Sequence, residues 1–287
     1  MKLEFFTPSY GVPADSFGAA TFGFVGAENE RAAAAIALPN DLWGDMLAGS
    51  YEECLAKLDR LPKKAWQVGI VLFGNAGGEN AFLRELQSRL EIPFVGGGAA
   101  ICPETGKGAL LTGGGQAAIL LVCDERYGFE VLRENIHHEI LGEHEVVFSD
   151  PRRIDSIDGN DPRVWLAEQK AKLGFSPDDF EHLTLSDLRG NNAHLSLVDG
   201  EIRSGRDLER RMLLRYVPRD KVQERMQAFY GDADTVIFGC AGLRGILPEK
   251  LHTRGVGLFL FGEVCYADGQ SEFANLMLSG LRIKSRL

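Results

Sequence analysis

The chain has 287 residues, of which 45% are apolar and 25% are charged, proportions that are ordinary for a globular protein. Its 31 Lys and Arg residues against 41 Asp and Glu residues give a formal net charge of −10. Such a surface repels phosphate backbones, so nucleic acid is not expected as a partner. The five cysteines are scattered without a C-x-x-C pair, which argues against a disulfide framework or structural zinc and favours a reducing compartment.

The N-terminal sequence places an acid, prolines and polar residues too early for a signal peptide. No run approaches the roughly 18 apolar residues that a membrane-spanning helix needs. We therefore expect a cytoplasmic protein with no membrane partner.

The first third of the chain begins with residues 1–49, which are rich in Gly, Pro and Ala and show no clear period. Ser50 and Glu53 then form a capping box, the sequence signature of a helix N-terminus. The elements predicted in this third are a helix from Ser50 to Pro62, a buried strand over 67–74, an amphipathic helix over 76–90 and strand–turn–strand elements over 92–124.

The middle of the chain is less apolar, and turn residues punctuate it. Asp161 followed by Pro162 is typical of a helix N-terminus, and Asp199-Gly200 is typical of a tight hairpin turn. The predicted elements are a strand pair over 144–159, a helix over 161–174, a hairpin over 193–205 and a helix over 220–230. The last segment predicts a strand over 235–239, a glycine-rich turn, a helix around 248–252, a strand over 256–262 and a final apolar stretch over 273–283.

Two segments of the chain look like copies of one unit. Residues 71–115 can be laid over residues 236–280 without a gap, and twelve of the 45 pairs are then identical, whereas about three are expected for unrelated segments. Shared glycines end the apolar run, the next turn and the whole unit in both copies, as in a duplicated supersecondary unit. We predict an α/β (α+β) fold of two pseudo-duplicated lobes, residues 1–143 and 144–287, with mixed β-sheets covered by outer helices and a ligand cleft between them.

The sharpest candidate site is the turn from Cys240 to Arg244, which follows an apolar strand. A strand that enters a Gly-rich turn and then a helix directs backbone N–H groups and the helix dipole at one spot. An anion would bind there with Arg244 as a second contact, and the pKa of a thiol placed there would be lowered. The alternative interpretation is that Cys240 is a small core residue and that the glycines only permit the turn.

A second candidate is Glu263, which follows Gly262 at the end of an apolar strand, where burying a carboxylate without a partner is costly. In the cleft it would bind an ammonium group or pair with Arg244; the alternative is a solvated residue just past the strand. At the positions of Cys240, Arg244 and Glu263 the first unit has Asn75, Glu79 and Gly98. The polar set therefore indicates specialisation of the second half.

Two further patterns predict no site. The glycine triplets at 96–98 and 113–115 do not fit the phosphate-loop motif and indicate close approach of strands instead. His137 and His144 do not match H-E-x-x-H, and on a helix they would lie about 10 Å apart, too far to share one ion. We predict no metal site, no cofactor and no catalytic residue.

The series TVIFGCAGLRG, GLFLFGEV and FANLMLSGL resembles the C-terminal part of FIST domains, sensory domains named for F-box and intracellular signal transduction proteins. IPFVGGGAA and IDSIDGNDP are similar to turns of the N-terminal FIST half, and the likeness covers roughly residues 65–287. Ala274 stands where the family's Phe-His-Asn motif has its histidine. The C-terminal motif positions are Phe238, Cys240, Arg244, Gly257, Gly262, Glu263, Phe273 and Asn275.

The resemblance implies a bacterial or archaeal module that binds a small molecule such as an amino acid and passes the signal on, here through a separate signalling protein. Arginine would pair with a carboxylate and glutamate with an ammonium group. The ligand-binding residues expected are Cys240, Arg244, Gly262, Glu263, Asn275, Gly97 and Gly98.

Two other functions stay open. One is an amidase or acyl-transfer enzyme with Cys240 as nucleophile and His194 or His252 as base. The other is a haem-based nitric oxide sensor, although the chain has no C-x-x-C-H and no histidine is marked as an axial ligand. The sequence does not predict the oligomeric state.

Overall fold

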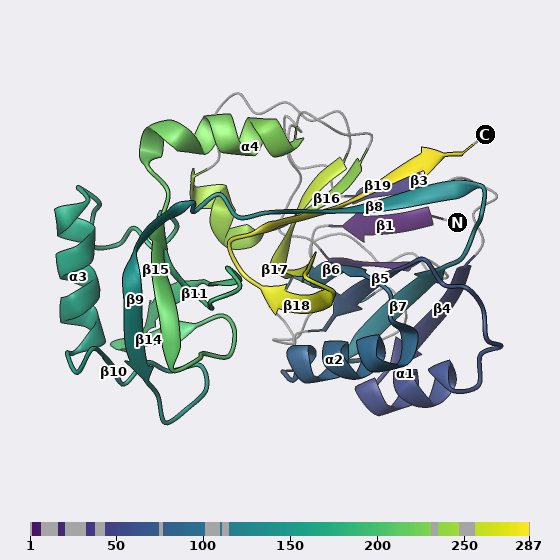
Figure 1. Cartoon of the computed structure of the whole chain (residues 1–287), viewed down its shortest axis with the longest axis horizontal. Helices are drawn as coiled ribbons and strands as arrows, with labels where there is room; N and C mark the ends of the chain where they lie inside the picture. Colours follow the sequence, from purple (N-terminus) through teal and green to yellow (C-terminus); the bar gives the residue numbers. More distant parts are fainter. Residues whose placement is uncertain are drawn as a thin grey trace.

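The centre of the molecule is a nine-stranded mixed sheet with the strand order β4-β7-β5-β6-β17-β16-β19-β8, and β18 pairs with β17 beside this path. It is seen in a computed structural model that describes residues 2–6, 17–20, 33–37, 44–74, 77–100, 110, 115–230, 235–246 and 256–286. Figure 1 shows this sheet on the right and a smaller sheet unit on the left. The predicted α+β class is confirmed.

The large sheet has two halves of like topology, joined by antiparallel pairing of β6 with β17. The first half is built from β4 (Gly44–Gly49), α1 (Tyr51–Leu58), β5 (Val68–Phe73), α2 (Glu79–Leu90), β6 (Phe94–Gly98) and β7 (Ala117–Val122). The second half is built from β8 (Tyr127–Glu134), α4 (Val222–Tyr230), β16 (Thr235–Cys240), the 3-10 helix η2 (Ala241–Ile246), β17 (Val256–Ala267), β18 (Gln270–Ala274) and β19 (Leu278–Ser285). In both halves a parallel strand pair, β5 with β6 or β16 with β17, is flanked by an antiparallel strand, β7 or β19.

Between β8 and α4 the chain builds the smaller unit, which we call the inserted unit (residues 135–221). Its main sheet has the order β10-β9-β15-β11-β12, beside the hairpin β13-β14. Its elements are β9 (Glu139–Val147), β10 (Ser156–Ile157), α3 (Pro162–Lys172), β11 (Leu183–Ser186), β12 (Asn192–Ala193), β13 (Leu195–Val198), β14 (Glu201–Ser204), β15 (Arg211–Tyr216) and the 3-10 helix η1 (Arg219–Lys221). The expected boundary between residues 143 and 144 falls inside β9.

A third sheet has the order β2-β1-β3, from β2 (Phe17–Ala20), β1 (Lys2–Phe6) and β3 (Ala33–Ala37). The helix expected around 248–252 lies outside the described residues.

The local signals in the sequence are confirmed where the structure describes them. The Ser50 hydroxyl accepts a hydrogen bond from the Glu53 N–H, and the Glu53 carboxylate accepts one from the Ser50 N–H, which completes the capping box of α1. Asp161 caps α3 with Pro162 at the first helical position. Asp199 and Gly200 take left-handed φ values of +52° and +81° at the turn of the β13-β14 hairpin.

The residue-by-residue alignment of the two copies is wrong in their first strands, although their topology is alike. It equates Phe73 with Phe238, but Phe73 packs under α1 and α2 while Phe238 packs on the opposite face of the sheet. In the structure Gly69 pairs with Phe94, and Gly239 pairs with Phe259. Gly69 and Gly239 are therefore the equivalent positions. The connection between the two parallel strands is therefore five residues shorter in the second copy. Because five is an odd number, the gap-free alignment equates residues of the first strands that lie on opposite faces of the sheet.

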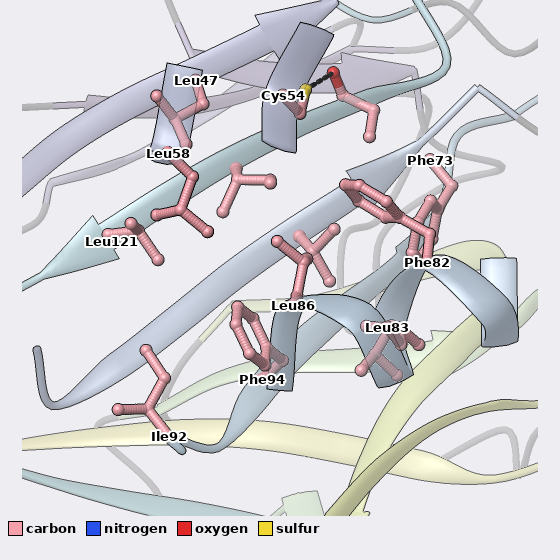
Figure 2. Close-up of a cluster of buried hydrophobic side chains, with 14 of the residues drawn as sticks. Leu47, Cys54, Leu58, Phe73, Phe82, Leu83, Leu86, Ile92, Phe94 and Leu121 are labelled. Atoms are coloured by element: carbon pink, nitrogen blue, oxygen red, sulfur yellow. Dashed lines mark hydrogen bonds between the residues drawn. The ribbon is translucent and has the colours of Figure 1, made fainter. Parts of the chain in front are cut away.

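Apolar side chains fill both faces of the large sheet. Figure 2 shows the cluster in which α1 and α2 pack on β5, β6 and β7, with the Cys54 thiol donating to the Ala117 carbonyl at 3.7 Å. Under α4 the equivalent cluster contains Tyr230, Phe259 and Leu278. A third cluster, which includes Ile70, Phe238 and Leu260, runs across the opposite face and joins the two halves. Both copies therefore carry their helices on the same face.

Gly69 tests this packing because a Cβ atom there would lie 2.3 Å from ring atoms of Phe94, which is fully buried. We expect Gly69→Ala to lower the free energy of unfolding by roughly 1–3 kcal/mol, since the ring has no room to move. The matched control is Gly128→Ala in β8, where the nearest atom would lie at 3.5 Å. Urea unfolding of both variants measures the effect, and an equal small change in the two would contradict the packing described.

Candidate functional site

Three irregular backbone segments of the second half meet at one place. Strand β16 ends at Cys240 and turns directly into η2. Strand β17 has a bulge at Gly262, which takes a φ of +74°. The connection from β18 to β19 contains Asn275 and Leu276, and Leu276 takes a φ of +51°, which is unusual for a bulky side chain. Left-handed residues at a convergence of strand ends are typical of functional sites.

The Cys240 thiol lies at the centre of this convergence and is 3% exposed. The backbone N–H groups of Gly242, Gly262 and Leu276 face its sulfur and act to lower its pKa. Burial, followed by the neighbouring Glu263, raises the pKa of the thiol, and the three N–H groups only partly oppose this. The expected lowering of the Cys240 pKa is therefore wrong, because the N–H groups expected to hold an anion surround a neutral thiol.

Glu263 is the most unusual residue of the site because its side chain is fully buried. Its Oε1 accepts a hydrogen bond from the Met277 N–H, while its Oε2 is buried without a hydrogen-bond partner. Burial raises the pKa of this carboxyl well above its usual range, and the Met277 N–H and the Cys240 thiol oppose the shift without cancelling it. Burial therefore disfavours the ionised form of Glu263 and favours its protonated, neutral form.

Small residues make the space in which Glu263 lies. It pairs with Gly97 of β6 on one side and with Ala274 of β18 on the other. A Cβ atom on Gly97 would lie 2.3 Å from the Gly262 carbonyl oxygen, so only glycine fits at this junction of the two halves. Gly98 pairs one step further along, opposite Phe261.

Two more buried polar atoms without partners lie close to Glu263 or to its neighbour Gly262. Asn275 is 2% exposed, its N–H donates to the Asn192 carbonyl at 3.0 Å, and its Oδ1 has no partner. Tyr230 of α4 is fully buried with an unpartnered hydroxyl, and burial together with the Glu263 carboxyl raises its pKa. Buried polar atoms are nearly always hydrogen-bonded in proteins, so this concentration marks the site.

The structure brings together six of the seven expected ligand-binding residues, but not Arg244. Cys240, Gly262, Glu263 and Asn275 surround one point, and Gly97 and Gly98 form its β6 side. Arg244 lies on η2 with its side chain exposed, whereas Glu263 is fully buried. The expected hollow shared by a guanidinium and a carboxylate is therefore not formed, because the 3-10 turn after Cys240 directs position 244 to the surface.

Apart from His194, which was considered as a base for Cys240, sequence reasoning missed the contribution of the inserted unit and of α4. A Cβ atom on Gly242 would lie 3.5 Å from the His194 ring, and one on Gly205 would lie 2.6 Å from the Asn275 Oδ1. Burial lowers the pKa of His194, and no hydrogen bond joins its ring to the Cys240 sulfur in the described part of the chain. The other base considered, His252, lies outside the described residues. Tyr230 offered no signal beyond its place at the end of a predicted helix.

The histidine-rich segment forms strand β9 and the residues before it, not a helix. His137 is fully buried, its Nε2 donates to the Glu181 carbonyl at 2.7 Å, and its Nδ1 accepts from Asn192 at 3.2 Å. Burial lowers the pKa of His137 to about 4, so it is neutral and structural. Within the described ranges no three His, Cys, Asp or Glu side chains gather as a metal site, and no helix is long and apolar enough to cross a membrane.

The comparisons with known proteins add no family. No model of a protein family matches the chain, and no curated protein shows a significant sequence match to it.

The protonation state of Glu263 makes a prediction about stability against pH. A carboxyl whose pKa is raised in the folded state binds its proton more tightly in the folded than in the unfolded chain. Its contribution to the free energy of unfolding is therefore largest at low pH and is lost as pH rises towards the raised pKa. We expect Glu263→Gln to become more stable relative to the wild type by up to about 1.4 kcal/mol for each pH unit between pH 5 and 8. Urea unfolding at several pH values measures this difference.

Glu139→Gln is the matched control, because Arg225 lowers the pKa of Glu139 and the carboxylate is ionised throughout this pH range. Its stability difference from the wild type is expected to stay constant from pH 5 to 8. A constant difference for Glu263→Gln as well would show that the Glu263 carboxyl titrates normally and is not buried as described.

Proposed function

We propose that this chain is a small-molecule-binding sensory domain without catalytic activity, and that Glu263 and Asn275 bind an N–H-bearing group of its ligand. The observation that carries the proposal is the fully buried Glu263 carboxyl with an unpartnered Oε2. A second unpartnered acceptor, Asn275 Oδ1, belongs to an amide that lies close to the neighbouring residue Gly262.

Energetics favour a binding role for these two atoms. An unsatisfied buried polar atom costs about 1–3 kcal/mol, more than most single hydrogen bonds contribute. A purely structural position would be filled at lower cost by an apolar side chain of similar size. Both Asn275 Oδ1 and the ionised form of Glu263 accept hydrogen bonds, so the complementary group is an ammonium or amide.

The resemblance to FIST domains supports the same reading. Glu263, Asn275 and Cys240 occupy motif positions, and these are the residues that the fold gathers. Ala274, at the position of the family's motif histidine, is the direct cross-strand neighbour of Glu263. Opposed side chains in an antiparallel pair are in contact distance, so a histidine there would lie beside the carboxyl. Its replacement by alanine leaves Glu263 without that neighbour and supports a ligand group as its partner.

Two properties of Cys240 count against the enzyme hypothesis. A thiol attacks as its thiolate, and burial raises the Cys240 pKa instead of lowering it. A cysteine nucleophile also needs a base in hydrogen-bond reach, and the His194 ring is not bonded to the sulfur. As a sensory domain of a cytoplasmic protein, the chain would pass its signal to a separate signalling protein.

A thermal-shift screen with primary amines, amino acids and primary amides tests the proposal. A ligand at 100 times its dissociation constant should stabilise the folded protein by about 2.7 kcal/mol. A bound ammonium group would favour the ionised form of Glu263 and contact its carboxylate. Glu263→Gln should therefore weaken a cationic ligand at least tenfold while the protein stays folded.

Glu272→Gln is the matched control, since this carboxylate lies on the neighbouring strand β18 and already forms an ion pair with Arg189. It should leave ligand affinity unchanged. The proposal fails if no compound of these classes stabilises the protein, or if the affinity of a ligand survives both Glu263→Gln and Asn275→Ala.

A further inference from the structure

The connection between β18 and β19, residues 275–277, is a strained segment of backbone at the edge of the candidate site. Leu276 lies at its centre and takes a φ of +51°, a conformation that a bulky side chain rarely adopts. Such a conformation persists only where the surrounding structure determines it. The contacts that hold this segment therefore also set the geometry of the site.

On the side of the large sheet, the segment supplies hydrogen bonds to Glu263 and Cys240. The Met277 N–H donates to Glu263 Oε1, and the Met277 carbonyl accepts from the Cys240 N–H at 3.4 Å. The other oxygen of Glu263, Oε2, has no hydrogen-bond partner. The position of the carboxyl therefore depends on where the segment places the Met277 N–H.

On its other side the segment is held by Asn192, a fully buried residue of β12 in the inserted unit. The Asn192 carbonyl accepts from the Asn275 N–H at 3.0 Å, and the Asn192 Nδ2 donates to the Leu276 carbonyl at 3.2 Å. These two bonds lie on either side of the left-handed φ of Leu276. One residue of the inserted unit thus stabilises the strained conformation.

The bonds from Asn192 and to Glu263 meet in a single peptide group. The Leu276 carbonyl and the Met277 N–H belong to the same peptide, and a trans peptide directs these two groups in opposite directions. The peptide accepts from Asn192 at one end and donates to Glu263 at the other. Hydrogen bonds in such a chain polarise one another, so the Asn192 bond strengthens the bond to the carboxyl.

The amide of Asn192 is itself fixed by neighbours on either side. Asn135 forms a reciprocal pair with it, with Nδ2 to Oδ1 distances of 2.9 and 3.0 Å. His137 Nδ1 accepts from Asn192 Nδ2 at 3.2 Å, and burial keeps this imidazole neutral by lowering its pKa to about 4. The Leu276 carbonyl can only accept, so it must face Nδ2 as well. A single orientation of the Asn192 amide satisfies all of these groups.

We propose that Asn192 is a positioning residue through which the inserted unit controls the Glu263 site. It orients and polarises the Leu276–Met277 peptide that binds Glu263, so a displacement of β12 changes the hydrogen bonding of the carboxyl and the affinity of the site. By thermodynamic linkage, a ligand bound at Glu263 changes the stability of the β12 contact by the same amount. This inference rests on the proposed function and adds the element that regulates it.

Amide hydrogen exchange, followed residue by residue by NMR, tests the role of Asn192 without a ligand. Asn192→Ala removes the Nδ2 donor but keeps the backbone carbonyl that accepts from Asn275. We expect the Met277 amide to exchange at least tenfold faster than in the wild type, after correction for the change in global stability measured by urea unfolding. The carbonyl band of Glu263 in infrared difference spectra against Glu263→Gln should move to higher wavenumber, because its bond from Met277 weakens.

Asn135→Ala is a second variant that does not touch the segment itself. It releases the Asn192 amide, and the half-buried position of Asn135 makes the substitution milder. It should accelerate Met277 exchange in the same direction by a smaller factor.

Asn191→Ala is the matched control, because Asn191 is the buried neighbour of Asn192 but its side chain bonds Asp187 and Glu272 instead. It should leave the corrected exchange rate of Met277 and the Glu263 band unchanged. Met277 exchange at the wild-type rate in Asn192→Ala and Asn135→Ala, or equally fast exchange in Asn191→Ala, would overturn the proposal. A failed amine screen would remove the proposed function without affecting this measurement, whereas unchanged exchange would remove the positioning role and leave amine binding in place.

Discussion

The burial of the Glu263 carboxyl is the constraint around which the second half of the molecule is arranged. The bulge at Gly262 turns this side chain into the interior, between Gly97 and Ala274, whose small size leaves room for it. Removing a carboxyl from water disfavours its ionised form, so burial favours the neutral form of Glu263, which depends on hydrogen bonds for its stability. The Met277 N–H satisfies one oxygen and the other has no partner, and the proposed binding role rests on this property.

Comparison of the two halves, within the residues that the structure describes, shows what the second half adds at this site. Both halves bury an apolar cluster under their helices, and a phenylalanine packs over a strand glycine in each. Only the second half carries the inserted unit, which contributes the Asn192 carbonyl to Asn275 and places His194 against Gly242. The first half therefore serves as scaffold, while the second half combines the same scaffold with residues from outside it.

Much of the fold could be predicted because the signals were local. The capping box at Ser50, the Asp161-Pro162 helix start and the Asp199-Gly200 turn each act within a few residues. The duplication was detected from glycine and phenylalanine matches at a fixed offset. This is a weaker signal, because such matches do not determine the register in which the strands pair. A five-residue difference in one crossover changes which face a strand residue occupies, and only the pairing of strands reveals it.

The site was predictable to the extent that strand ends and motif positions mark it. Cys240 and Glu263 end apolar runs, and Asn275 belongs to the FIST-like motif, so each could be named from the sequence. Arg244 was misplaced because the pattern did not distinguish a 3-10 turn from the start of an α-helix, and the two direct a side chain differently. Tyr230 and His194 reach the site through tertiary packing across long sequence separations, which no spacing in the chain encodes.

We expect the buried Glu263 carboxyl, whose Oε2 has no partner, to be in its neutral form. Infrared difference spectroscopy of the wild type against Glu263→Gln at neutral pH observes this group directly. We expect a carbonyl band of a protonated, weakly hydrogen-bonded carboxylic acid that is absent from the variant. A wild type that shows only carboxylate bands at neutral pH would contradict it.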